Sequence, residues 1–332
     1  MKILNTIIYF SLLSIINCND KESVVKKTEI DNLKSQEEVQ SFIRKTDSTF
    51  NHYEVKKIED FKTDDLIFLE NQKIAKKEGV NKSFYKTDFD NNGYTDLLVL
   101  GDAYHCISSG NQSCSYDPIV ILSFGNNKYR FINFSLGLQN YLTPKIKKIN
   151  GKNLLSIYKP IIKSWEEKKF EETPFVQNLE YKFGEFVEYN SNDKNYIPIQ
   201  KIELLTSGCF GTCPVFQLSI DQNRNAHFIA EHFNFSNNME SWSENIEGKF
   251  HTVIDEKQYE SLTGTLQYID FPNLKDNYAV NWTDDQTVIL KITYAGNKLK
   301  VIQDYGATGT YGLRSTYKKL FDLRKNQHWS KN

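Results

Sequence analysis

Residues 202–220, IELLTSGCFGTCPVFQLSI, hold two apolar segments separated by a pair of cysteines, Cys209 and Cys213. In the second segment Phe216, Leu218 and Ile220 alternate with polar residues. Successive side chains of a β-strand point to opposite faces, so this alternation predicts a half-buried strand. The stretch therefore predicts two strands joined by a short loop that contains both cysteines.

Downstream of this stretch, helix and hairpin signals alternate. Asp255 and Gln258 are placed to begin a helix, and Gly296-Asn297 predicts a turn between two strand-like runs at 288–294 and 299–302. The apolar face expected for this helix consists of Tyr259, Leu262, Leu266 and Ile269. A final helix is also expected, with an apolar face of Leu313, Tyr317, Leu320 and Phe321. Helices beside antiparallel hairpins predict an α+β domain over residues 197–330.

The preceding part of the chain is rich in hairpin signals. Ser35-Gln36-Glu37-Glu38 has the spacing of a capping box and predicts a short helix, and a second helical stretch follows Asp64-Asp65. Turn signals then occur at Asp90-Asn91-Asn92-Gly93, Gly125-Asn126-Asn127, Asn150-Gly151 and Gly184. Each lies between strand-like runs, so we predict an antiparallel, β-rich domain over residues 35–190. The fold class expected for the whole chain is α+β with two domains.

The N-terminus predicts export. Met1-Lys2 precedes an apolar run that is too short to span a bilayer and ends at Asn17-Cys18. Residues 1–18 resemble a bacterial lipoprotein signal peptide, which implies that Cys18 is lipidated and that the protein is anchored to a membrane of the cell envelope. Residues 19–34 are charged and lack aromatic side chains, so we expect a flexible tether there.

The charge balance excludes one class of partner. Lys and Arg total 41 and Asp and Glu total 42, a formal net charge of -1. Such a chain has no strong positive field for nucleic acid.

Apart from Cys18, the cysteines form two close pairs, Cys106 with Cys114 and Cys209 with Cys213, which in an exported protein predicts two local disulfides.

Residues 88–96, DFDNNGYTD, place oxygen ligands at alternating positions. The side-chain oxygens belong to Asp88, Asp90, Asn92 and Asp96, and a backbone carbonyl belongs to Tyr94. This spacing can wrap Ca²⁺ in oxygen, with Gly93 at the sharp turn. Position twelve is Val99 and strand-like residues flank the loop, so it differs from an EF-hand and resembles the calcium hairpins of integrin-like extracellular β repeats. The alternative is a solvated turn closing a hairpin.

The pair Cys209 and Cys213 also allows two interpretations. The Cys-x-x-x-Cys-Pro spacing resembles the copper-binding thiols of thioredoxin-fold copper chaperones, which would imply a redox or Cu(I) site. In those proteins the second cysteine opens a helix, whereas here Pro214 leads into the predicted strand at 215–220. The exported context and this strand favour a structural disulfide.

The same stretch resembles a known family. Ser207 to Phe216, together with residues 300–306 and the closing helix, is similar to an uncharacterised domain of exported bacterial proteins, domain of unknown function 6438. The similarity spans about residues 199–329 and implies a fold unit without a known reaction.

Two functions remain as hypotheses. The first is a non-catalytic, lipid-anchored envelope protein that acts as a binding module for an unknown ligand or protein. The second is a periplasmic thiol-redox or copper-handling protein that uses Cys209 and Cys213.

Overall fold

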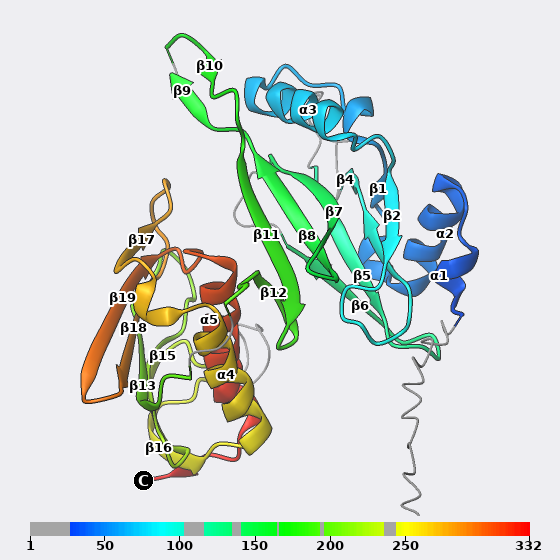
Figure 1. The fold of residues 1–332 in the computed structure, drawn as a ribbon. Coiled ribbons are helices and arrows are strands. Elements are labelled where there is room, and N and C mark those ends of the chain that lie inside the picture. The colour runs from blue at the N-terminus through cyan, green and yellow to red at the C-terminus, as the bar shows by residue number, and fades with distance from the viewer. Residues whose placement is uncertain (1–26, 103–115, 135–140, 165, 193–195, 236–243) are drawn as a thin grey trace, which may run out of the picture.

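The structure is a computed structural model that describes residues 27–102, 116–134, 141–164, 166–192, 196–235 and 244–332. The described part is β-rich, with mostly antiparallel sheets and a few helices (Figure 1). The predicted signal peptide at 1–18, with Cys18, lies outside the described residues, as does the predicted Cys106–Cys114 disulfide.

Three helices open the described part of the chain, and the second and third begin where their capping residues predict. They are α1 (Glu29–Asn32), α2 (Gln36–Thr46) and α3 (Leu66–Glu78), with short 3-10 helices at Ser48–Phe50 and Ile58–Asp60. The Ser35 side chain accepts from the Glu38 N–H, and the Glu38 carboxylate accepts from the Ser35 N–H at 3.0 Å. The Asp65 carboxylate caps α3 by accepting from the backbone N–H groups of Ile67 and Phe68. Both predicted helices are therefore confirmed.

The predicted flexible tether ends earlier than expected. Ile30 and Leu33 of the α1 region are buried in a hydrophobic cluster with strand residues such as Leu97. The Lys86 ammonium also donates to the carbonyl oxygens of Asp31 and Leu33. A tether over residues 19–34 is thus wrong from residue 28 onward, because burial of two apolar side chains fixes this turn to the fold.

Two four-stranded antiparallel sheets follow α3. The first has the order β2 (Phe84–Thr87), β3 (Asp96–Val99), β5 (Ile119–Ser123), β6 (Tyr129–Asn133), and the second has the order β12 (Glu185–Glu188), β11 (Phe175–Lys182), β8 (Lys152–Lys159), β7 (Thr143–Ile149). Two two-stranded sheets pair β1 (Glu54–Val55) with β4 (Gly101–Asp102) and β9 (Ile162–Ser164) with β10 (Lys169–Phe170). All four predicted hairpin turns connect paired strands. A shared hydrophobic cluster that includes Leu98 and Leu155 joins the two four-stranded sheets.

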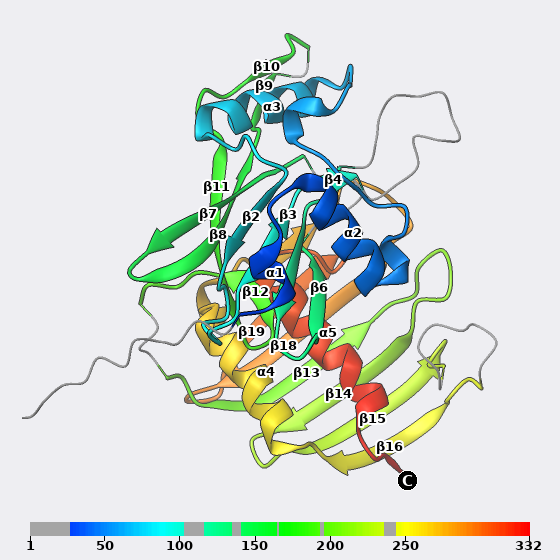
Figure 2. The same cartoon turned by 90° about the vertical axis from the view of Figure 1, so that its right-hand side faces the viewer.

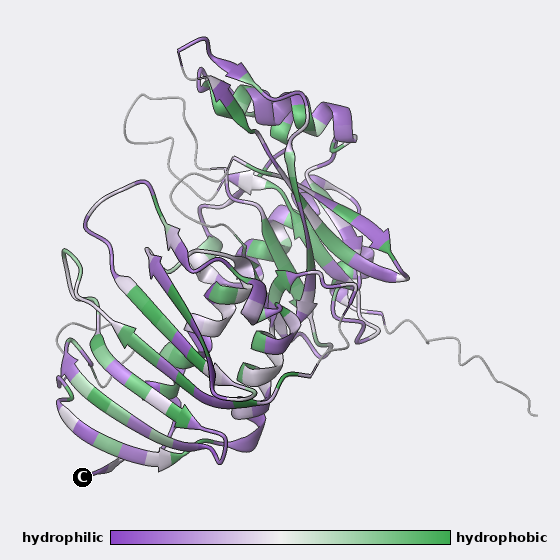
Figure 3. Cartoon of the chain, turned by 60° about the vertical axis from the view of Figure 1, so that its left-hand side comes forward, coloured by the Kyte–Doolittle hydropathy of each residue, from purple (hydrophilic) through white to green (hydrophobic). Residues whose placement is uncertain are grey.

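The remaining strands form one eight-stranded sheet. Its order is β17 (Asn277–Ala279), β19 (Lys298–Tyr305), β18 (Thr287–Tyr294), β13 (Ile199–Thr206), β14 (Val215–Asp221), β15 (Asn225–His232), β16 (Gly248–Val253), β20 (Ser330–Lys331). Only β17 pairs in parallel among these described strands. The predicted alternation of β14 is confirmed, since Phe216, Leu218 and Ile220 are buried, and Figure 3 shows hydrophilic and hydrophobic residues alternating along the large sheet.

Two helices cover one face of this sheet (Figure 2). They are α4 (Glu256–Tyr268), which begins at Asp255 as predicted, and α5 (Tyr311–Asn326); a 3-10 helix lies at Phe271–Asn273. Leu262 and Leu320 of these helices share a core cluster with sheet residues such as Leu290. Among the helices of the described residues, none is long and apolar enough to cross a membrane.

The second four-stranded sheet contacts α4 and α5 directly. Val187 of β12 belongs to the core cluster of the large sheet, and Tyr311 of α5 belongs to the cluster between the smaller sheets. The Tyr268 hydroxyl of α4 donates to the Glu180 carboxylate of β11. The predicted division into domains at 35–190 and 197–330 stays a prediction, and these contacts join β11 and β12 to α4 and α5.

Candidate functional site

The hairpin between β2 and β3 gathers three carboxylates. Ligand oxygens of Asp88, Asp90 and Asp96 all lie within 4.8 Å of one another. The local sequence causes this approach, because Asp88 and Asp90 stand on the turn and Asp96 begins β3, whose register pairs it with Thr87. Three of the five predicted calcium ligands are therefore close together.

The turn is ordered by its own side chains. The Asp88 carboxylate accepts from the backbone N–H groups of Asn92, at 3.2 Å, and Gly93, at 2.9 Å. The Asn92 side-chain oxygen accepts from the Tyr94 N–H at 2.8 Å, and its amide donates to Asp90 at 3.0 Å. These bonds are those of an Asx-rich turn, so the turn geometry is common to both interpretations of the loop.

Asp96 is the innermost of the three acids. Its side chain is fully buried, and its two oxygens accept from the N–H groups of Phe89 and Ser123, each at 2.8 Å. Burial raises the pKa of Asp96 to about 7, with the charges of Asp90 and Asp88 adding to the rise. Burial also raises the pKa of Asp90 to about 6, and its hydrogen bond and charge interaction with Asp88 raise it further.

This donor set suits a hard divalent cation. Carboxylate oxygens are the ligands that Ca²⁺ prefers, and a cation among the three would favour their ionised forms. Burial first, and neighbouring negative charge second, disfavour the ionised forms of Asp96 and Asp90, and two carboxylates with raised pKa values at one loop mark a candidate functional site. Asp88, Asp90 and Asp96 are thus chemically fit to hold calcium, with Asn92 and Tyr94 on the same turn.

The second predicted site is a disulfide in the structure. Cys209 and Cys213 are bonded, with their Cα atoms 5.7 Å apart, in the loop between β13 and β14. Pro214 leads directly into β14. The Gln286 amide donates to the carbonyl oxygens of Ser207 and Pro214, at 2.7 and 2.8 Å, so both ends of the loop are held by the residue that precedes β18.

A pocket that the sequence analysis did not predict lies where β6, β12 and the first turns of α5 meet. It has a volume of about 220 Å³. Its polar lining includes Arg130 of β6, Glu185 of β12, and Arg314 and Lys318 of α5. Apolar residues, among them Phe131, Phe134 and Phe186, complete its walls.

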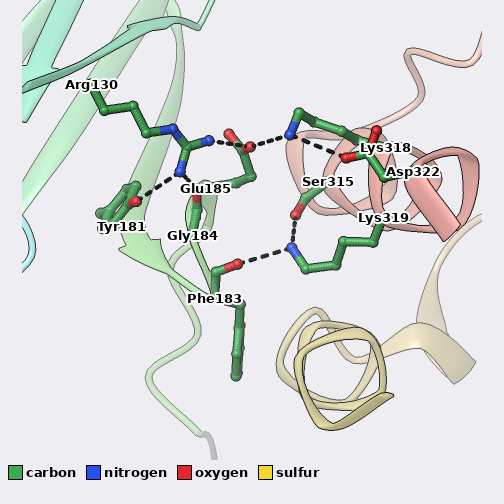
Figure 4. A network of polar contacts seen from close by, with 9 residues as sticks. All are labelled: Arg130, Tyr181, Phe183, Gly184, Glu185, Ser315, Lys318, Lys319 and Asp322. Atoms are coloured by element: carbon green, nitrogen blue, oxygen red, sulfur yellow. Dashed lines mark hydrogen bonds and ion pairs between the residues drawn. The ribbon is translucent and has the colours of Figure 1, made fainter. Parts of the chain in front are cut away.

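Figure 4 shows Glu185 between the cations of the two sides. The Arg130 guanidinium contacts the Glu185 carboxylate at 2.6 Å and donates to the Gly184 carbonyl at 2.6 Å. The Lys318 ammonium lies 3.2 Å from the same carboxylate. Next to them, the Lys319 ammonium donates to the Phe183 carbonyl at 2.9 Å, and burial lowers the pKa of Lys319 to about 8.

No local motif could have predicted this pocket. Its residues come from three segments, at 130–134, 185–186 and 311–318, which meet only through tertiary packing. The one available signal was the pair Arg314 and Lys318, two cations four residues apart on a predicted helix.

Comparison with known proteins finds a family match for one segment of the chain. A model of a family described as a domain of unknown function (DUF6438) matches residues 200–324, which confirms that part of the predicted resemblance. The matched segment runs from β13 into α5 and includes the disulfide loop. Neither a curated protein nor a solved structure matches the chain.

Proposed function

We propose that this chain is a non-catalytic, calcium-binding protein of the bacterial cell envelope, anchored through a lipid on Cys18 and acting as a binding module. We further propose that residues 35–190 and 197–330 form its two domains. The observation that carries the calcium role is the approach of the Asp88, Asp90 and Asp96 carboxylates to within 4.8 Å of one another.

The physical argument is one of charge. Three carboxylates this close repel one another when ionised, and the burial of Asp96 adds a cost of desolvation. A bound Ca²⁺ would offset both effects, and it would hold the β2–β3 turn against the neighbouring strand β5, whose Ser123 already donates to Asp96.

The expected affinity is modest. Val99 stands where an EF-hand has a bidentate glutamate, so we expect a dissociation constant on the order of 10⁻⁴ to 10⁻³ M, as in extracellular calcium modules. At about 10 mM calcium this predicts a stabilisation of about 1.4 to 2.7 kcal/mol. The resulting role is structural, in keeping with a protein that works outside the cytoplasm where calcium is abundant.

Titration calorimetry and thermal melting with calcium test this proposal. We expect saturable heat at millimolar calcium and a higher melting temperature, both lost in Asp90→Ala. The matched control is Asp64→Ala, which removes an exposed carboxylate outside the cluster and should keep both responses. Absence of heat and of a melting shift in the unaltered chain would show that the loop is an ordinary turn.

A further inference from the structure

The face of the eight-stranded sheet that α4 and α5 leave open carries a pair of histidines. In the register of β15 with β16, His227 stands directly opposite His251. Both side chains are exposed, whereas Ala226 and Phe228, which flank His227 in the chain, belong to the buried core cluster that also contains residues of α4 and α5. Because side chains alternate along a strand, the two imidazoles share the face opposite the helices.

This register brings two metal-binding side chains within reach of one ion. Residues directly opposite each other on antiparallel strands have Cβ atoms about 4.5–5.5 Å apart. A histidine nitrogen binds Zn²⁺ at about 2.0–2.1 Å, so two rings at this spacing can place one nitrogen each on a single ion. The spacing is fixed by the sheet, because β15 also pairs with β14 and β16 also pairs with β20.

A hydrogen bond to His251 leaves the other nitrogen of its ring free for a metal. The Nδ1 atom of His251 contacts the side-chain oxygen of Asn332. An amide oxygen only accepts, so Nδ1 carries the proton and donates it, and Nε2 keeps its lone pair. Metal-binding histidines use this arrangement, in which an outer oxygen fixes the tautomer and the orientation of the ring. Asn332 is held in turn, since its backbone N–H donates to the Lys249 carbonyl at 2.9 Å.

A carboxylate lies beside the histidine pair. Asp221 ends β14, where Ser219 stands opposite His227. Side chains two residues apart on a strand share a face, so Asp221 lies diagonally across from His227 on the same face, and the two charges interact. Hydrogen bonds from Asn223 and Asn225 hold the carboxylate in place. A fixed negative charge at this position favours the binding of a cation.

The imidazoles select the class of cation. Imidazole nitrogen suits Zn²⁺, Cu²⁺ and Ni²⁺, whereas Ca²⁺ and Mg²⁺ prefer oxygen ligands. The two histidines are exposed, so water can fill the remaining positions around the ion. The pair thus differs in chemistry from the carboxylate cluster of Asp88, Asp90 and Asp96, which lies at a different sheet.

We propose that His227 and His251 together bind a divalent transition-metal ion, with Asp221 beside them as a favourable charge. This site goes beyond the proposed calcium role and does not depend on it.

Titration calorimetry of the full-length chain in detergent tests the proposal. Zn²⁺ is added in a buffer that contains excess calcium and no chelator, so that calcium competes for the carboxylates of the β2–β3 hairpin. We expect saturable heat with Zn²⁺ and none that depends on the histidines with Mg²⁺. Cu²⁺ should bind more tightly than Zn²⁺, as the Irving–Williams order requires, and its electron paramagnetic resonance spectrum should show coupling to two nitrogen nuclei.

Three variants locate the site. His227→Gln and His251→Gln each replace an exposed side chain, so without metal the melting temperature should change little. Each should weaken Zn²⁺ binding at least about tenfold, because the remaining imidazole binds without chelation. His232→Gln is the matched control, because it removes an exposed histidine from the other end of β15, and it should change the affinity less than about twofold.

The inference is overturned if the unaltered chain gives no saturable response to Zn²⁺, or if His227→Gln and His251→Gln bind Zn²⁺ as His232→Gln does. Asp90→Ala separates this inference from the calcium proposal, because the variant should lose the calcium response and keep Zn²⁺ binding. Loss of Zn²⁺ binding in Asp90→Ala would place the ion at the hairpin and would also overturn the inference. Zn²⁺ binding by a chain that shows no calcium response would contradict the calcium proposal alone.

Discussion

The Glu188 carboxylate, at the end of β12, accepts a hydrogen bond from the backbone N–H of Gly312 in the first turn of α5, at 2.9 Å. The two residues are 124 positions apart in the chain. A Cβ added to Gly312 would lie 2.9 Å from a Glu188 carboxylate oxygen and 2.3 Å from a methyl carbon of Ile269. The close fit of β12 to α5 therefore depends on the absence of a side chain at this position.

Gly312→Ala should destabilise the protein. The added methyl group overlaps both Ile269 and Glu188, and overpacking of this kind costs about 1 to 3 kcal/mol. Denaturant unfolding measures the change. Gly208→Ala is the control, because its added Cβ would come no closer than 4.0 Å to a neighbouring atom, and a loss of similar size in both variants would contradict the steric explanation.

Calcium affinity should fall as the pH decreases. Asp96 and Asp90 have folded pKa values of about 7 and about 6, and calcium binds their ionised forms. Without calcium, the raised pKa values favour the protonated fold, so this contribution to stability is present below about pH 4 and is lost as the pH rises through about 7. Calcium binding opposes that loss.

Calorimetry at about pH 8 and about pH 5 should therefore show a dissociation constant at least tenfold larger at the lower pH. Calcium binding near pH 6 should also release protons, which appears as a dependence of the heat on the buffer's ionisation enthalpy. An affinity that does not change over this range would mean that the two carboxylates are not ligands.

Replacing both Cys209 and Cys213 with Ser should lower stability by about 2 kcal/mol. The two cysteines are four positions apart, and the chain-entropy model gives a small effect for so short a loop. The oxidised pair should also have a reduction potential below about -300 mV, as structural disulfides do. Stoichiometric Cu(I) binding by the reduced protein would instead support the thiol-redox or copper-handling hypothesis.

Cys18→Ser should move the protein from the membrane fraction to the soluble fraction. A lipoprotein anchor carries more than one acyl chain, which is enough for stable membrane attachment, and the substitution removes the attachment point. Fractionation followed by immunodetection measures the change, with Cys106→Ser as a control that should stay with the membrane. Retention of Cys18→Ser in the membrane after removal of the signal would contradict lipidation.

Local sequence signals predicted the local structure well. Ser35 and Glu38 form the predicted capping box, and the turn at Gly184 joins β11 to β12, because both depend on residues within a few positions of each other. The gathering of Asp88, Asp90 and Asp96 follows from the same kind of short-range spacing.

Features that depend on distant residues could not be predicted. Ile30 and Leu33 are too few to form a visible period, and only the sheet that covers them shows that they are buried. The pocket where β6, β12 and α5 meet needs Arg130 beside Lys318, which are brought together by the packing of β12 against α5. The local sequence around neither residue indicates that the two lie close together.

The central position of β13 has a consequence for how the chain folds. This strand pairs with β14, which follows it closely, and with β18, where Leu204 stands opposite Leu290. The second pairing requires a loop of more than 80 residues to close before its contacts can form. Since such non-local pairing slows folding, we expect refolding on a timescale of about milliseconds to seconds, with the β13–β14 hairpin forming ahead of the completed sheet.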